Sequence, residues 1–121
     1  MQALGDKTRL RLLNLLAGGE LCVCYLVEIL GESQPKISRH LGTLRHAGVV
    51  AARREGKWMH YRLVRPADPH QASALDALLA AIAEEREMQR DRAMLEKACC
   101  ALRLPETLQR APKPELRMRA S

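Results

Sequence analysis

The chain has 121 residues, which is enough for one domain with a hydrophobic core but too short for separate cofactor and substrate domains. Hydrophobic residues make up 47% of it, yet phenylalanine is absent and aromatic residues total 2%, so the core must be aliphatic, which favours helices. The net charge of +6, from 20 Lys and Arg against 14 Asp and Glu, points to an anionic partner.

Three helical patterns occupy the first part of the chain. Asp6 is a candidate N-cap for the first helix, which ends at the glycines of residues 18–19. A second, short helix is predicted over residues 21–30. Ser33 is a candidate N-cap for a third helix, which runs to about Ala47.

The third predicted helix has two different faces. With an advance of about 100° per residue, Ile37, Leu41 and Leu44 fall together as a buried stripe. The opposite side, within an arc of about 120°, carries cationic and hydrogen-bonding side chains. These are Lys36, Arg39, His40, Thr43 and His46.

After the third helix the hydrophobic pattern changes to period two, which predicts a β-hairpin. Gly56 permits the positive φ that a tight hairpin turn needs. The two predicted strands, joined at Glu55 and Gly56, are residues 49–54 and 57–64. The basic residues at the hairpin tip are Arg53, Arg54 and Lys57.

Positive charge is concentrated in one segment of the chain. Between residues 33 and 65 there are eight Lys and Arg and a single acid, so this segment carries +7 and the remainder −1. A polyanion-binding surface requires such a concentration. Helix, tight turn, polar-faced helix and basic hairpin predict a winged helix-turn-helix, a mainly α fold with a β-hairpin wing (α+β).

The C-terminal part is predicted to form a long helix. Asp68 and Pro69 are typical of a helix start, and residues 70–104 contain neither Gly nor Pro, so an unbroken helix would extend ~50 Å. Its apolar stripe needs a surface beyond its own domain, which favours a homodimer. We expect residues 1–104 to form the folded domain and residues 105–121, rich in Pro and charge, to be a disordered tail.

The compartment follows from what the sequence lacks. No stretch approaches the roughly 20 apolar residues of a membrane span, and the charged start is unlike a secretory signal, so we expect a cytoplasmic protein with no membrane partner. In a reducing compartment the four cysteines are expected to be thiols, metal ligands or redox sensors rather than structural disulfides.

Four segments resemble the ArsR/SmtB family of metal-responsive repressors. LGDKTRLRLL at residues 4–13 resembles its opening helix, SQPKISRHL at 33–41 its recognition helix, and residues 48–57 its wing. ELCVCYL at 20–26 resembles the thiolate motif of its arsenic and cadmium/lead sensors. The resemblance covers roughly residues 4–104. It implies a dimeric repressor that sits on a palindromic operator in double-stranded DNA and leaves it when a soft metal or metalloid binds.

The same resemblance, together with the charge pattern, suggests which side chains contact DNA. A helix can enter the major groove, where basic and amide groups reach phosphates and base edges, while the wing holds the neighbouring backbone. The candidates on the third helix are Ser33, Gln34, Lys36, Ser38, Arg39, His40 and Thr43. Those on the wing are Arg53, Arg54 and Lys57.

Cys22 and Cys24 are candidate ligands for a soft ion, since thiolates select such ions over Mg²⁺ or Ca²⁺. In an ideal helix the two thiols would point about 200° apart, so both can hold one ion only if the backbone is distorted there. Binding is therefore expected to deform the start of the second helix, directly before the recognition helix.

The motif departs from the family's arsenic branch at two positions. Tyr25 replaces an Asp, and Val27 replaces a third Cys. Trivalent arsenic normally takes three thiolates, so either the third comes from elsewhere or the ligand needs only two, as a monomethyl arsenical does. Cys99 and Cys100 are the other candidates and look similar to the vicinal pair near the C-terminus of some arsenic sensors.

Other functions remain open at this stage. A repressor of the same fold could respond to thiol oxidation, or to Cd or Pb. The zinc site of the family's zinc-sensing branch looks absent because residues 76–92 contain acids but no His. Nothing indicates an enzyme or a permanent cofactor, since Cys-x-x-Cys, a Gly-rich phosphate loop and a Ser-His-Asp arrangement are all missing. The expected inducer is As(III), methylarsenite or another soft metal ion.

Overall fold

The helices and strands of the computed structural model follow the predicted order, with two differences described below. The structure describes residues 6–100, 112 and 114; of residue 100 only the backbone is described. Within this part of the chain the elements are α1 (Lys7–Leu16), β1 (Leu21–Cys22), α2 (Val23–Leu30), α3 (Gln34–His46), β2 (Val50–Glu55), β3 (Trp58–Leu63), α4 (Pro69–Ala83) and α5 (Arg86–Cys100).

The three predicted N-caps are confirmed. The carboxylate of Asp6 accepts a hydrogen bond from the backbone N–H of Thr8 at 2.8 Å, and Ser33 Oγ accepts from the N–H of Lys36 at 3.4 Å. Asp68 caps α4 in the same way. Each cap satisfies a donor that has no partner within its helix, which is why the helices begin where the sequence predicts.

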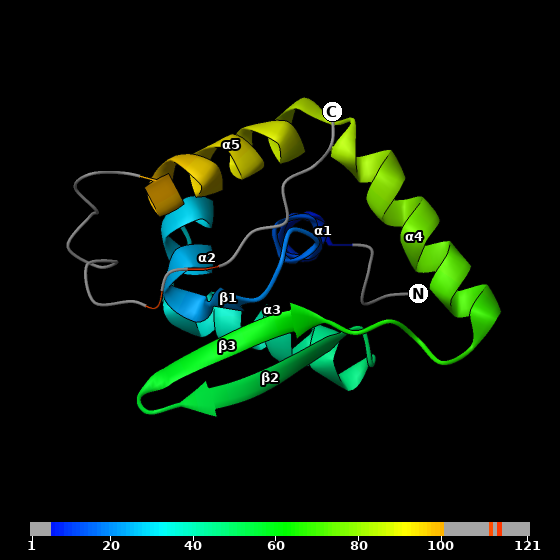
Figure 1. Ribbon diagram of the computed structural model, residues 1–121, viewed down its shortest axis with the longest axis horizontal. Coiled ribbons are helices and arrows are strands. Elements are labelled where there is room, and N and C mark those ends of the chain that lie inside the picture. Colours follow the sequence, from blue (N-terminus) through cyan, green and yellow to red (C-terminus); the bar gives the residue numbers. More distant parts are fainter. Residues whose placement is uncertain (1–5, 101–111, 113, 115–121) are drawn as a thin grey trace.

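α1 lies at the centre of the fold, with the sheet on one side and α4 and α5 arching over it on the other (Figure 1). The predicted stripe of α3 is buried as expected, since Ile37, Leu41 and Leu44 are each 0% exposed. Together with leucines of α1 and α2 they form one core of aliphatic side chains. The winged helix-turn-helix is therefore confirmed, with α2 and α3 as its helix pair.

The wing has one more strand than predicted. β2 and β3 form the expected antiparallel hairpin, but its turn lies one residue later, at residues 56–57, where Gly56 has φ 60°. A third strand, β1, pairs with β3 in the order β1-β3-β2, with Leu21 opposite Tyr61 and Cys22 opposite His60. The second helix was expected to start at residue 21, and it starts instead at Val23.

The stretch expected as one long helix is divided in two. α4 ends at Ala83 and α5 begins at Arg86, and the chain changes direction sharply between them (Figure 1). No Gly or Pro marks the break. α5 turns back because its side chains gain partners on α1, and Met88 and Leu95 become buried there.

A buried polar network fastens α5 to α1. Arg11 donates from Nε and Nη2 to the two carboxylate oxygens of Asp91 at 2.8 and 2.9 Å. Asn14 donates to the carbonyl of Met88 at 2.9 Å and accepts from Arg92. Asp91 and Asn14 are each 1% exposed. These partners fix the position of α5 over α1, because breaking them would leave buried charge unpaired.

Two expectations fall outside what the structure describes. The predicted tail, residues 105–121, lies outside the described residues except for 112 and 114, and so does the side chain of Cys100. Among the residues that are described, no helix combines the length and the apolar character that crossing a bilayer demands.

Candidate nucleic-acid interface and thiol site

The exposed face of α3 carries part of the predicted DNA-contacting set. Gln34, Ser38 and Arg39 are exposed, as is Arg45, which the sequence analysis did not select. Arg45 lies in the last turn of α3, where its charge is also favourable for the helix dipole. A contiguous polar and cationic surface therefore exists on the helix.

Other candidates on α3 already have partners within the chain. The Nζ of Lys36 lies 3.1 Å from a carboxylate oxygen of Glu32. The hydroxyl of Thr43 donates to the backbone carbonyl of Arg39 at 3.2 Å. The Ser33 hydroxyl is engaged as the cap, and His40 is half-buried. These candidates are consequently less available to a binding partner than the helical projection predicts.

The wing candidates differ among themselves. Arg54 is exposed and its guanidinium takes part in none of the ion pairs found in residues 6–100. Lys57 lies over the ring of Trp58, with Nζ 5.1 Å from the ring centroid, so the tip of the wing is ordered by a cation–π contact. Both side chains are placed to meet a polyanion.

Arg53 is held on two sides by carboxylates. Its Nη2 lies 2.6 Å and its Nε 2.8 Å from Oε1 of Glu20, and its Nη1 lies 2.8 Å from Oε2 of Glu55. The hydrogen bond from Arg53 holds the pKa of Glu20 below its ordinary value, although partial burial opposes it. Nearby Arg53, His60 and Arg62 lower the pKa of Glu20 further through their charges.

The two thiols of the cysteine motif are in contact. Cys24 Sγ donates to Cys22 Sγ at 2.9 Å. The expectation that these thiols diverge until the backbone is distorted is wrong, because Cys22 is not helical. It is the N-cap of α2, with φ −68° and ψ 143°, so its side chain turns back toward the first helical turn. The pair is formed before any ion arrives.

This contact separates the acidities of the two thiols. The hydrogen bond from Cys24 lowers the pKa of Cys22 to about 7, helped by the backbone N–H groups of Val23 and Cys24 at the start of α2 and opposed by burial. The same hydrogen bond, with burial, raises the pKa of Cys24. The lowered pKa of Cys22 increases the share of this thiol that is present as thiolate at neutral pH, and the thiolate is the form that reacts with soft electrophiles.

Tyr25 follows Cys24 on α2 and belongs to the buried core. It is 0% exposed, and its hydroxyl has no hydrogen-bond partner among the residues described. Burial raises the pKa of Tyr25, and the charges of Cys99, Cys24 and Cys22 add to the effect. Cys99, half-buried on α5, packs on the same core as Cys24. One end of the core thus gathers three thiols around a buried phenol.

The structure does not bring the predicted sulfur ligands into a single complete set. Within the described residues no three His, Cys, Asp or Glu side chains are arranged to hold a metal ion. Cys22 and Cys24 form a two-sulfur site, Cys99 packs on the same core without completing a three-ligand set among the described residues, and the side chain of Cys100 is outside them.

Two residues beside the thiols were not predicted. Glu20 immediately precedes β1, and His60, the β3 residue opposite Cys22, is 5% exposed, with no hydrogen bond to Nε2 from the described residues. Both residues come close to the thiols because β1 pairs with β3. A strand of two residues is too short to show the alternating pattern that would predict this pairing. Neighbourhood in sequence to Cys22 was the only available signal for Glu20.

A family model and several known proteins match this chain. Residues 6–52 match the model described as bacterial regulatory protein, arsR family. The arsenical resistance operon repressor of Escherichia coli K12 is 57% identical over 61 residues, covering 50% of this chain and 52% of the relative. Arsenic resistance transcriptional regulator ArsR1 of Pseudomonas putida is 45% identical over 87 residues, covering 71% and 65%.

The fold also matches a solved structure, the transcriptional repressor BigR from Xylella fastidiosa. The identity is 33% and the TM-score 0.58, with 70% of this chain and 83% of that chain covered. By contrast, the chain spans about half the length of the Escherichia coli relative and 65% of the Pseudomonas one. The structural likeness therefore covers more of the chain than the family segment of residues 6–52 does.

Proposed function

The chain belongs to the ArsR family of bacterial regulatory proteins, and from this premise we propose that it represses an operon for arsenic resistance and leaves its operator when a trivalent arsenical binds. The two relatives named for arsenical resistance support the choice of operon and inducer. The observation that carries the proposal is the preformed thiol pair, with its sulfurs 2.9 Å apart. The protein acts in the cytoplasm without a permanent cofactor.

DNA binding is assigned to α3 and the wing. Arg39 and Gln34 on the exposed side of α3 face the major groove, and Arg54 and Lys57 hold the adjacent backbone. Phosphate contacts supply most of the affinity, whereas only the few groups on α3 that reach base edges set the sequence preference.

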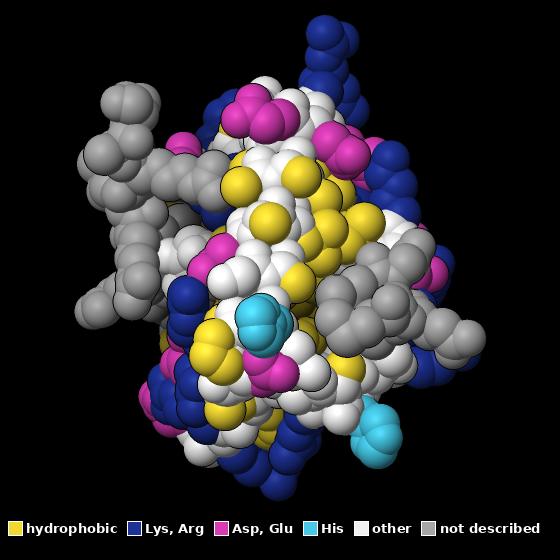
Figure 2. Space-filling model, turned by 90° about the vertical axis from the view of Figure 1, so that its right-hand side faces the viewer, with side chains coloured by type: hydrophobic (Ala, Val, Ile, Leu, Met, Phe, Trp, Pro, Cys, Tyr) yellow, Lys and Arg dark blue, Asp and Glu magenta, His cyan; other side chains and the backbone are white. Residues whose placement is uncertain are grey.

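The operator-bound form is a homodimer. Small and apolar side chains are exposed on α4, among them Ala74, Ala77 and Ala81, with Leu78 half-buried beside them. Figure 2 shows hydrophobic side chains gathered along the face of the molecule that carries α4. A second copy of the same face covers this surface most simply, because a twofold interface is complementary to itself. Twofold symmetry also suits a palindromic operator.

The inducer is held by Cys22 and Cys24. Two sulfurs meet the full thiolate requirement of a monosubstituted arsenical such as methylarsenite, and As(III) needs one sulfur more. Cys99 is the nearest thiol known to share this end of the core, and it supplies the third sulfur if α5 moves toward α2. Soft thiolate ligands also suit Cd or Pb, which makes these ions competing inducers.

One titration tests the proposal. Protein bound to operator DNA is titrated with arsenite, methylarsenite, Cd²⁺ and Zn²⁺, and release is followed by fluorescence anisotropy of the DNA. We expect release by the arsenicals, and Cys22→Ser with Cys24→Ser should abolish it while leaving DNA binding intact. A fully reduced protein that stays on the operator in excess arsenical contradicts the proposal. Release that survives the paired substitution moves the site to Cys99 and Cys100.

Thiol oxidation is a second candidate, favoured by the same contact. An ionised Cys22 attacks a peroxide, which gives a sulfenic acid and one molecule of water or alcohol, and the Cys24 thiol then displaces water to form a disulfide. The peroxide is reduced and the two thiols are oxidised. Release of DNA by peroxide in proportion to the protein, with no release by arsenite, would select this function.

A further inference from the structure

The thiol pair and the wing are joined by an ion pair. Glu20, two residues before Cys22, holds Arg53 of β2 with separations of 2.6 and 2.8 Å from its Oε1. Thirty-three positions separate the two residues in sequence. We propose that Glu20 is the positioning residue that transmits a change at the thiol pair to the wing, through Arg53. The proposal rests on the proposed function, since it says how inducer binding reaches DNA.

The register of the sheet places the parts of this link in one row. Cys22 lies opposite His60 on β3, and His60 lies opposite Arg53 on β2. Directly paired residues of antiparallel strands carry their side chains on the same face, so the row crosses all three strands. His60 fills its middle, with Nδ1 3.9 Å from Glu20 and Nε2 3.9 Å from Glu55. A displacement of Cys22 at one end of this row therefore acts on His60, and a displacement of His60 acts on Arg53.

Binding an ion requires such a displacement. The sulfurs of Cys22 and Cys24 are 2.9 Å apart and share a hydrogen bond. Two bonds of ~2.3 Å to one thiophilic centre, meeting at roughly a right angle or wider, hold their sulfurs about 3.3 Å apart or more. The pair must therefore lose its shared proton and open by about 0.4 Å or more. Cys24 is fixed within α2, so the movement falls on Cys22 and the short strand β1 that follows Glu20.

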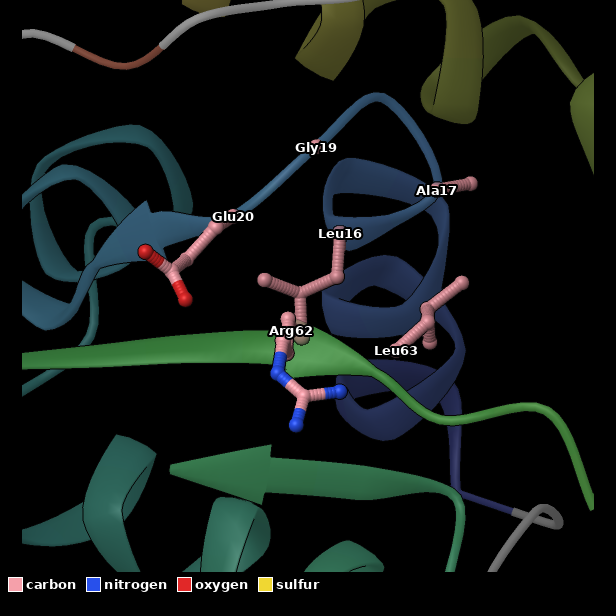
Figure 3. A pocket seen from close by; sticks show the side chains of 6 residues that line it. All are labelled: Leu16, Ala17, Gly19, Glu20, Arg62 and Leu63. Carbon is pink, nitrogen blue, oxygen red and sulfur yellow. The ribbon is translucent and has the colours of Figure 1, made fainter. Parts of the chain in front are cut away.

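The structure has space for the Glu20 side chain when its carboxylate leaves Arg53. A pocket of about 310 Å³ lies beside it, between the end of α1 and β3, lined by Leu16, Ala17, Gly19, Glu20, Arg62 and Leu63. Figure 3 shows the Glu20 carboxylate directed toward β3, from which Arg62 extends. Arg62 offers a second cationic partner within electrostatic reach. Exchange of partners moves the carboxylate without leaving it unpaired.

Arg53 remains able to contact DNA while Glu20 holds it. A guanidinium has five N–H donors on its three nitrogens. The contacts to Glu20 and Glu55 involve all three nitrogens but not all five donors, so N–H groups remain for a phosphate. Its side chain is 50% exposed. A carboxylate behind the arginine fixes the direction of the guanidinium, so that loss of Glu20 disorders a phosphate contact on the wing. The proposed link thus predicts that the wing binds DNA only while no inducer is bound to the thiols.

The test compares Glu20→Gln with Glu55→Gln. Both substitutions remove one carboxylate from Arg53, but Glu55 is two residues away on the same strand, whereas Glu20 directly precedes β1 and the thiol pair. For each protein, operator affinity is measured with and without methylarsenite, and the ratio of the two dissociation constants is the coupling. Inducer binding is measured separately by the fluorescence of Trp58, the single tryptophan of the chain, and by the number of thiols blocked.

We expect the coupling of Glu20→Gln to fall by about tenfold or more while its thiols still bind the inducer, and that of Glu55→Gln to match the wild type. Unchanged coupling in Glu20→Gln, or an equal loss in both variants, overturns the proposal.

A second measurement does not depend on arsenic. Because coupling is reciprocal, operator DNA should change the alkylation rate of Cys22 and Cys24 in the wild type and Glu55→Gln but not in Glu20→Gln. A wild type whose alkylation ignores DNA also overturns the link. If arsenicals fail to release the wild type while DNA still alters alkylation through Glu20, the proposed inducer is wrong and the link stands.

Discussion

The thiol of Cys24 donates a hydrogen bond to the sulfur of Cys22 across 2.9 Å, because Cys22 ends a strand and caps the helix in which Cys24 lies. Under the proposed function, an arsenical therefore meets a site that needs no helix to unwind. Binding there requires that the shared proton is lost and that the two sulfurs separate. The conformational change that we propose for induction then falls on the chain just before α2 rather than on α2 itself.

Removal of the hydrogen-bond donor Cys24 should raise the pKa of its partner Cys22. In Cys24→Ala, we expect the pKa of Cys22 to rise from about 7 toward the ordinary thiol value, because the hydrogen bond that stabilises the thiolate is lost. Thiolate ultraviolet absorption, measured against pH with and without Cys22, reports the change. The wild type should accordingly bind arsenicals more slowly as pH falls through 7, where Cys22 becomes protonated. A pH profile that is the same in both proteins contradicts this assignment.

The two arms of the DNA-binding surface should respond differently to alanine. Arg39→Ala is expected to weaken operator binding by about 1–3 kcal/mol and to relax its sequence preference, since α3 reads bases. Arg54→Ala should weaken binding to all sequences alike and reduce the salt slope by about 1, as the loss of one phosphate contact does. Anisotropy titrations at several salt concentrations, with operator and scrambled DNA, separate the two effects. If neither variant alters the isotherms, α3 and the wing are not the interface.

The buried ion pair between α1 and α5 should be costly to break. Asp91→Ala leaves Arg11 without its bidentate partner in a half-buried place, and a loss of about 3–5 kcal/mol in the free energy of unfolding is expected. Glu87→Gln is the matched control, because this carboxylate also contacts Arg11 but is 38% exposed. Its loss should be at most about 1 kcal/mol. Equal effects in urea denaturation would show that burial of Asp91 does not matter.

Gly42 is a site where the helix can be strengthened. It lies in the interior of α3 and is exposed, and an added Cβ would meet no atom within 4 Å. Glycine in a helix interior is destabilising relative to alanine by about 0.5–1 kcal/mol, so Gly42→Ala should raise the unfolding free energy by that amount. Thermal and urea unfolding measure the gain. Gly31→Ala is a contrasting control, since its φ of 67° makes a side chain unfavourable and a loss is expected there.

Local rules in the sequence predicted the DNA-binding half of the fold. Asp6, Ser33 and Asp68 each start a helix because a side-chain oxygen satisfies nearby backbone donors, and this depends only on adjacent residues. The buried stripe of α3 and the hairpin follow from periodicity in the same way. The family resemblance added an interpretation of the cysteine motif as a site for a soft ion.

Tertiary contacts decided the rest. The break between α4 and α5 has no Gly or Pro to signal it, and it exists because Asp91 finds Arg11, a residue 80 positions earlier. β1 is too short to show a period, and it forms because β3 offers Cys22 a partner. The pattern of charged residues shows which segments carry charge. It does not show which carboxylate pairs with which arginine, because that pairing depends on distances in the folded chain. Hence the sequence alone identified the cysteines and the cationic residues. Only the folded chain revealed the ion pair of Glu20 with Arg53, which connects the thiol pair to the wing.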